Sequence, residues 1–231
     1  MSIPISEIAV VLPARDEAEL LPAALTALEA ARERFARSNP AVLVSITVVL
    51  DATTDNSRVL LSGCPGVRTV SVLAGRVGTA RNAGIAAACS QARVPADTLW
   101  IANTDADSEV PTHWIERQHE LAVGGAHVVV GTVEPRSIDL GKHTLQRWLV
   151  SHQLIEDHPH IHGANLGFRA SVFAGLGGFR DEGLHEDRDF VVQARERGYA
   201  VLATDSCRVK TSGRLQGRAT GGFADFLTGL G

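Results

Sequence analysis

Short apolar runs separated by longer amphipathic stretches fill the first half of the chain. Four runs are rich in Val, Ile and Leu, and they span residues 8–12, 42–50, 67–73 and 99–103. The run at residues 8–12 is apolar throughout, which is typical of a strand that is buried on both faces. Between them, residues 20–38 and 77–91 carry apolar or small side chains at helical spacing. The alternation predicts a mostly parallel α/β sheet with helices on both faces.

The second half is less regular but predicts the same kinds of element. The apolar spacing predicts helices at residues 112–121, 142–156 and 186–197, and strands at 127–133, 165–169 and 199–204. A polar loop at 157–163 contains His158, His160 and His162, which could bind a metal, although their spacing defines no site. The glycine-rich, basic segment 210–223 could cover an anionic ligand or form a solvated tail.

Composition and charge narrow the class of protein. The chain has 231 residues, of which 45% are hydrophobic, and this suits one α/β domain over residues 1–231. The net charge of −4 gives no basic field for nucleic acid. The three cysteines have no metal-like spacing, and no apolar run reaches the roughly 18 residues of a spanning helix. We expect a cytoplasmic protein; peripheral contact with a membrane stays open.

The clearest candidate chemistry follows the apolar run at residues 99–103. Asp105 and Asp107 come directly after it, one residue apart. Ligands bind beyond the carboxyl ends of the strands in open α/β sheets. Mg²⁺ is usually held by one or two carboxylates together with substrate phosphates. The pair therefore predicts a divalent-cation site, and an Asp-rich turn without a ligand is the alternative.

Charged residues at two predicted helix starts add further candidates. Arg81 lies in the first turn of a small-residue helix, where a phosphate could meet both a guanidinium and the helix N-terminus. The alternative is a surface arginine on a packed helix. Glu186 and Asp187 open another predicted helix, where acidic residues also serve simply to complement the helix dipole. The chain has neither a P-loop nor a dinucleotide fingerprint after its first strand.

Six short motifs together resemble those of the family 2 glycosyltransferases, and they occur in the family's order. They lie at residues 11–17, 48–55, 80–84 (ARNAG) and 104–107 (TDAD), at 163–165 together with 177–179, and at 186–187. The second motif departs from the family's VDDGSTD, because Leu50 replaces its first Asp and Ala52 its Gly. Many relatives also place a metal-binding His late in the chain. Here no His follows His185, and Arg214 and Arg218 could contact the donor phosphates instead.

The resemblance implies a GT-A-like (Rossmann-like) fold, with a nucleotide-sugar-binding half at 1–107 and an acceptor-side half at 108–231. It implies an inverting, metal-dependent transfer of a sugar from a nucleotide-sugar donor to a hydroxyl group of a small-molecule or glycan acceptor. Mg²⁺ or Mn²⁺ would bind Asp105 and Asp107. Asp187 would act as the base, with Glu186 as the second candidate. The donor-binding residues would be Pro13, Ala14, Arg15, Glu17, Asp51, Arg81, Asp105 and Ala106.

Two other classes of protein stay open on the sequence alone. A nucleotidyltransferase of related fold would also use a strand-end aspartate with Mg²⁺. It would normally carry a glycine-rich loop after its first strand, and residues 13–17 contain no glycine. A non-catalytic nucleotide-sugar-binding protein is the second alternative, which the retained carboxylates disfavour.

Overall fold

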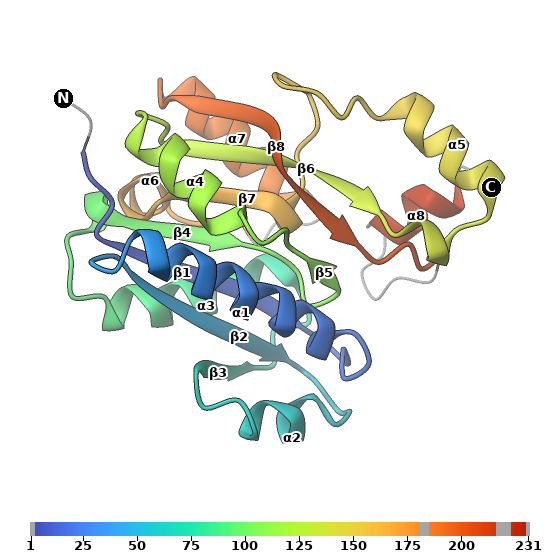
Figure 1. Cartoon of the computed structure of the whole chain (residues 1–231), viewed down its shortest axis with the longest axis horizontal. Helices are drawn as coiled ribbons and strands as arrows, with labels where there is room; N and C mark the ends of the chain where they lie inside the picture. The colour runs from blue at the N-terminus through green and yellow to red at the C-terminus, as the bar shows by residue number, and fades with distance from the viewer. Residues whose placement is uncertain (1–2, 181–184, 216–222, 230–231) are drawn as a thin grey trace.

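The computed structural model describes residues 3–180, 185–215 and 223–229, except for the side chains of residues 225 and 226. Its centre is an eight-stranded sheet with the strand order β3-β2-β1-β4-β7-β6-β8-β5 (Figure 1). The strands are β1 (Glu7–Ala14), β2 (Leu43–Asp51), β3 (Val67–Val72), β4 (Leu99–Asn103), β5 (Ser108–Glu109), β6 (Val128–Pro135), β7 (Leu166–Arg169) and β8 (Val201–Thr211). The helices are α1 (Leu21–Ser38), α2 (Ser57–Ser62), α3 (Val77–Gln91), α4 (Trp114–Val123), α5 (Lys142–Ser151), α6 (Ala170–Leu176), α7 (Glu186–Glu196) and α8 (Phe223–Thr228).

The first four long strands form the parallel unit that the sequence predicts. β3, β2, β1 and β4 pair in parallel, with Ala14 opposite Leu50 and Val11 opposite Asn103. β7 then runs antiparallel to β4, so Leu166 at its start lies opposite Asn103 at the end of β4. The loops that follow β1, β2 and β4 and the turn that precedes β7 therefore meet at one edge of the sheet.

Helices cover both faces of this sheet, as predicted. Along β1, Val10 and Leu12 belong to the apolar cluster that includes α1 and α4, while Ala9 and Val11 belong to the cluster that includes α3, α6 and α7. The strict alternation follows from the two-residue period of a strand. Gly84 lets α3 approach closely, because an added Cβ would lie 2.6 Å from side-chain carbons of Val11 and Val49.

Two predicted elements of the second half have different limits in the structure. α5 ends at Ser151 instead of residue 156, because the chain turns back and the ring of His152 stacks between Trp148 and His160. β8 extends to Thr211, well beyond the predicted end at residue 204. Polar residues hide this extension in the sequence, since they form a bulge in which residues 205–208 face the single residue Thr132 of β6.

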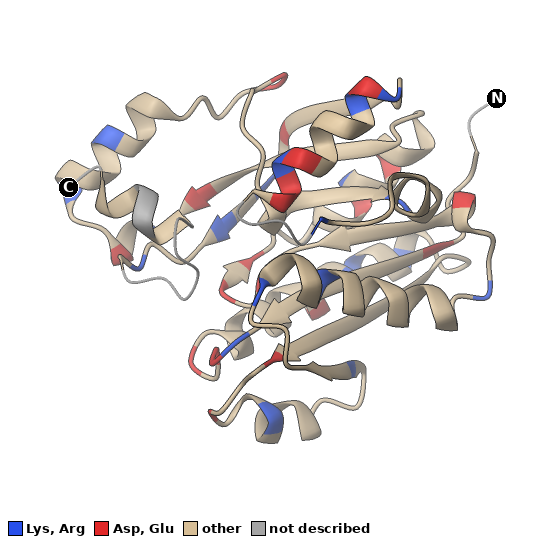
Figure 2. Ribbon diagram, turned by 180° about the vertical axis from the view of Figure 1, so that it is seen from behind, with Lys and Arg blue, Asp and Glu red and all other residues tan. Residues whose placement is uncertain are grey.

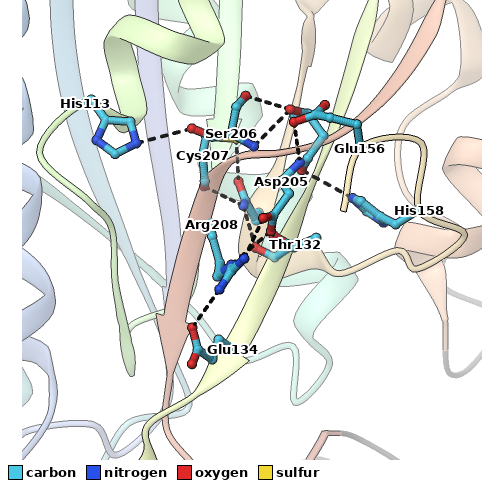
Figure 3. Close-up of polar contacts among 11 residues, drawn as sticks. His113, Thr132, Glu134, Glu156, His158, Asp205, Ser206, Cys207 and Arg208 are labelled. Carbon is cyan, nitrogen blue, oxygen red and sulfur yellow. Dashed lines mark hydrogen bonds and ion pairs between the residues drawn. The ribbon is translucent and has the colours of Figure 1, made fainter. Parts of the chain in front are cut away.

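The bulge is stabilised by a polar network (Figure 3). Arg208 donates to Asp205 through Nε at 2.9 Å and forms an ion pair with Glu134 at 3.3 Å. Behind the bulge, the buried Asn165 side chain donates to the carbonyl oxygens of Thr132 and Cys207 at 2.8 and 2.9 Å. These bonds fix the turn at residues 163–165, directly before β7.

The sequence analysis did not anticipate α2, β5 or α8, each of which is six residues long or shorter. Most of the glycine-rich tail, residues 216–222, lies outside the described residues. Within the described part of the chain, no helix combines the length and apolar composition that a membrane crossing requires. Positive and negative side chains are interspersed over the ribbon, and acidic residues mark α7 (Figure 2).

Candidate functional site

The loops after β1 and β2 are tied together at the carboxyl edge of the sheet. The Asp16 carboxylate accepts a hydrogen bond of 2.7 Å from the Thr54 backbone N–H, and Asp55 accepts one of 2.7 Å from the Ala18 N–H. The hydroxyl of Thr53 donates to the Ala14 carbonyl oxygen at 3.0 Å. The structure thus brings the predicted donor-binding segment 13–17 next to the loop that begins at Asp51. Within the segment, Ala14 and Glu17 are buried, Pro13 is half-buried and Arg15 is exposed.

Asp51, the predicted base-binding carboxylate, is buried at the end of β2. Its Oδ1 accepts hydrogen bonds from the backbone N–H groups of Ala74 and Gly75, at 2.7 and 2.9 Å. These bonds shape the turn after β3 and hold the carboxylate in place. The following residue, Ala52, has a φ of +49°, a left-handed conformation that is strained for any residue with a Cβ.

Arg81 lies at the centre of the site and is not the surface residue that the alternative interpretation supposed. It is only 3% exposed, and its guanidinium joins two carboxylates from distant elements. One nitrogen donates to Oδ1 of Asp105 at 2.7 Å, and the other donates to Oε1 of Glu186 at 2.5 Å. Burial by itself would lower the pKa of Arg81, but Asp105 and Glu186 outweigh it and the pKa is raised. The arginine therefore stays charged and fixes the relative positions of the two acids.

Two glycines leave room for this buried ion pair. A Cβ on Gly163 would lie 2.4 to 2.5 Å from the guanidinium atoms of Arg81, and a Cβ on Gly78 would lie 2.9 Å from Cγ of Glu186. Burial raises the pKa of Glu186, although the charge of Arg81 opposes this shift. Close packing on both sides leaves Glu186 fixed against Arg81.

Asp187, the next residue, faces a different partner. Its Oδ2 accepts a hydrogen bond of 2.7 Å from the backbone N–H of Gly163, and its Oδ1 accepts one of 2.8 Å from the Arg188 N–H. Asp187 is partly exposed, whereas Glu186 is buried. Of the two acids that begin α7, Asp187 is therefore the one that can reach a bound molecule.

Asp107 forms a second ion-pair group with Glu17 and Arg214. The Arg214 guanidinium makes two hydrogen bonds to the Glu17 carboxylate, at 2.6 and 2.9 Å, and lies 3.0 Å from Oδ2 of Asp107. Burial and the nearby charge of Asp105 raise the pKa of Asp107 to about 6, although Arg214 opposes this shift. Ala106, the residue between the two predicted metal ligands, is buried in the core.

Asp105 and Asp107 are the two carboxylates that the sequence predicts to share a divalent cation. Each contacts a different arginine through one oxygen, and the other oxygen of Asp107 has only long contacts, of 3.3 and 3.4 Å, with the hydroxyls of Ser108 and Thr211. Among the residues described, no group of three or more His, Cys, Asp or Glu side chains is arranged to hold a metal. This donor set fits a cation that takes its remaining ligands from phosphate oxygens.

The histidines of the 157–163 loop serve packing. His152, His160 and His162 have ring centroids 4.6 to 6.3 Å apart, and His162 also packs edge-on against Phe223 of α8. His158 is buried and its Nε2 lies 3.3 Å from the Thr204 carbonyl oxygen. The described residues give no support to a metal site in this loop.

Sequence reasoning identified the charged residues of this site but missed their pairing. Glu17 and Arg214 lie 197 positions apart, and Arg81 and Glu186 lie 105 apart. The sequence analysis also did not predict that Arg81 packs against Gly163. Its only signal was its place in one of the motifs that resemble the glycosyltransferases.

Comparison with known proteins gives a family and several structural neighbours. The sequence profile described as Glycosyl transferase family 2 matches residues 9–177. A comparison with curated protein sequences gives no match. Among solved structures, residues 1–349 of S. aureus TarS in complex with UDP have a TM-score of 0.67 at 12% identity, over 90% of this chain and 61% of that TarS fragment.

Two further neighbours carry a metal in their structures. The mannosyltransferase PcManGT from Pyrobaculum calidifontis, in complex with GDP-Man and Mn²⁺, has a TM-score of 0.63 at 18% identity, over 94% of this chain and 61% of PcManGT. Glucosyl-3-phosphoglycerate synthase from Mycobacterium tuberculosis, in complex with Mn²⁺, UDP and glucosyl-3-phosphoglycerate, has a TM-score of 0.56 at 14% identity, over 89% of this chain and 71% of the synthase. The chain thus spans about six tenths of the length of the TarS fragment and of PcManGT, and 36% of a longer TarS chain. At these identities the likeness concerns the fold.

Proposed function

Because the chain belongs to glycosyl transferase family 2 and has the expected GT-A fold, we propose that it moves a sugar from a nucleotide-sugar donor to an acceptor hydroxyl group, with inversion at the anomeric carbon. One observation supports this most strongly. Arg81 holds Asp105 and Glu186 together at the edge where ligands bind in such sheets, and Asp187 lies beside them with partial exposure. The family match favours this function over nucleotidyl transfer.

The donor side of the reaction must stabilise a departing nucleoside diphosphate. Bound between Asp105 and Asp107, Mg²⁺ or Mn²⁺ would supply positive charge to that leaving group. Arg81 holds the Asp105 carboxylate through a bond of 2.7 Å, so this ligand is oriented before the donor arrives. Two structural neighbours are complexes with Mn²⁺, one together with GDP-Man and one together with UDP, and this supports a divalent cation here.

The loops after β1, β2 and β4 would hold the rest of the donor. Asp51 offers a carboxylate fixed by the Ala74 and Gly75 N–H groups, and it would bind the base. Segment 13–17 lies beside it and would contact the base and ribose, and Arg15 in this segment is exposed. The backbone at Ala106 would line the phosphate side.

The acceptor side needs a base that removes the proton of the attacking hydroxyl. Glu186 is buried and committed to Arg81, so its carboxylate serves to position Arg81 and Asp105. Asp187 is anchored by one oxygen to the Gly163 N–H and is partly exposed, which suits a general base. A single base and a single displacement imply inversion. A small molecule or a glycan would supply the hydroxyl.

A transfer assay over a panel of UDP- and GDP-sugars, with Mn²⁺ and with Mg²⁺, tests the proposal directly. Asp187→Asn should reduce transfer by about 10²-fold to 10⁴-fold, the usual contribution of a general base, and leave nucleotide binding nearly unchanged. Glu196→Gln, at the exposed far end of α7, is the matched control and should retain full transfer. Full transfer by Asp187→Asn would remove Asp187 from the role of base.

A further inference from the structure

Arg214 occupies an unusual position between two loops of the donor site. Its guanidinium binds both oxygens of Glu17, in the loop after β1, and one oxygen of Asp107, in the loop after β4. Arg214 itself follows β8, so three separate parts of the chain meet at one charged group. The positive charge of Arg214 therefore lies against Asp107, one of the two proposed metal ligands.

The backbone around Arg214 is anchored, so this contact is not that of a loosely attached side chain. The Ser212 N–H donates to the Asp107 carbonyl oxygen at 3.1 Å, and the Gly213 N–H donates to Oδ2 of Asp139 at 2.9 Å. The Arg214 N–H donates to the hydroxyl of Ser212 at 3.3 Å. The side chain can therefore change partner while its Cα stays beside the donor site.

Charge considerations show when such a change is favourable. A divalent cation that binds Asp107 alone must displace, or lie close to, a guanidinium of the same sign, which is unfavourable at short range. A diphosphate that arrives with the cation reverses this, because its oxygens accept the two parallel N–H groups of a guanidinium as well as a carboxylate does. The arginine then exchanges a carboxylate partner for a phosphate partner.

We propose that Arg214 neutralises Asp107 in the unliganded protein and transfers to the diphosphate of the donor, so that the divalent cation binds well only together with the donor. The part of this proposal that concerns the donor rests on the proposed function. The part that concerns binding of the cation without a donor does not. Arg214 is then a binding residue for the leaving group. It also blocks binding of the cation alone.

Arg208, on the strand that precedes Arg214, provides a matched control. Its side chain is 33% exposed, close to the 29% of Arg214, and it too joins two acids, Asp205 and Glu134. Those partners belong to β6 and to the bulge of β8 (Figure 3), whereas the acids that Arg214 contacts belong to the loops after β1 and β4. Removing the charge of Arg208 should therefore affect neither cation nor nucleotide binding.

The test titrates Mn²⁺ against the whole chain, with free Mn²⁺ followed by electron paramagnetic resonance, and repeats the titration with UDP and with GDP. Arg214→Gln should bind Mn²⁺ alone about tenfold more tightly than the original protein. In the presence of Mn²⁺ it should bind UDP or GDP, whichever the original protein binds more tightly, about tenfold more weakly. Arg214→Lys keeps the charge without the planar fork, so it should keep Mn²⁺ binding weak and still lose nucleotide affinity. Arg208→Gln should match the original protein in both.

Equal binding of Mn²⁺ alone by the original protein and Arg214→Gln would overturn the proposal, and so would unchanged nucleotide affinity in both Arg214 variants. Circular dichroism identifies a variant that has not folded, in which case Arg214→Lys decides through nucleotide affinity. If neither nucleotide binds to any form, the proposed function fails, whereas the titration with Mn²⁺ alone still decides whether Arg214 blocks the cation.

Discussion

Gly163 shows how one missing side chain shapes the site. The Arg81 guanidinium fills the space that a Cβ would need, and the Gly163 N–H also holds Asp187. This single residue thus contacts both the positioning arginine and the proposed base. Its φ lies outside the left-handed region, so the need for glycine here comes from space alone.

We expect Gly163→Ala to displace Arg81 and to lower the stability by about 1–3 kcal/mol, the usual cost of overpacking. Transfer should fall with it, because Asp105 and Asp187 both lose their orientation. Urea unfolding and the transfer assay measure the two effects. Gly141→Ala is the control, since a Cβ there meets nothing within 4 Å. Equal stability of the two variants would contradict the packing argument.

Ala52 leads to a prediction of opposite sign. At a φ of +49° its Cβ is strained, so Ala52→Gly should stabilise the protein by about 0.5–1 kcal/mol. Ala36→Gly, on the exposed face of α1, should destabilise it by about 1 kcal/mol, because glycine is the poorer helix former there. Thermal unfolding of both variants checks the pair, and a lower melting temperature for Ala52→Gly would refute the strain.

The positions of individual charged residues at the ends of strands and helices were largely predictable from the sequence, whereas their partners were not. Asp105, Asp107 and Arg81 stand at ends of elements that the hydrophobic pattern locates. Their pairing depends on how separate loops meet at the sheet edge, and no local pattern contains that information. Arg81 illustrates this, because its burial follows from Gly163, far along the chain.

The segment between α5 and β7 is the element whose stability should depend most on pH. Its rings stack from Trp148 through His152 and His160, and His162 packs on Phe223. Burial, followed by the neighbouring histidines, lowers the pKa of His162 to about 3, and burial also lowers the pKa of His152 and of His160. The folded segment therefore favours neutral rings.

Folding lowers the pKa of such a histidine from about 6.5 in the unfolded chain. The free energy of unfolding is therefore highest at a pH above about 6.5, and it decreases as the pH falls from there toward the pKa of the folded state. For His162 the loss between pH 7.5 and pH 5 should be about 2 kcal/mol. His162→Gln should flatten this dependence, while His143→Gln, at an exposed position of α5, should keep it. Urea unfolding at the two pH values measures the difference. Parallel pH profiles for His162→Gln and the original protein would argue against the assignment.

Elements were easiest to predict where both faces of a strand are buried. β1, β4 and the second half of β2 satisfy this condition, and the limits of these strands lie within two residues of the apolar runs, whereas β3 has no fully buried residue. β8 does not, since its bulge places Asp205 and Ser206 in the middle of a strand and breaks the apolar pattern. The helix predicted to residue 156 ends early because ring stacking with His160 turns the chain back, and helical spacing cannot reveal such a contact.

The molecule as a whole brings residues from Glu17 to Arg214 to one edge of the sheet, so binding of the donor should stabilise the entire fold. A ligand that binds only the folded state at about 100 times its Kd adds about 2.7 kcal/mol. We expect UDP or GDP with Mn²⁺ to raise the melting temperature, and nucleotide or Mn²⁺ alone to do so much less. Asp105→Ala should lose the metal-dependent part of the shift, and Glu196→Gln should keep it. A full shift in Asp105→Ala would contradict the metal assignment.

The reversal of direction at β7 has an evolutionary consequence. Because β7 starts where β4 ends, the chain returns to this edge of the sheet through residues 152–162, while the parallel strands that carry the proposed donor loops stay intact. These residues lead into Gly163, whose N–H binds the proposed base Asp187. Under the proposed function, insertions or deletions in residues 152–162 would change the choice of acceptor without rebuilding the proposed donor site.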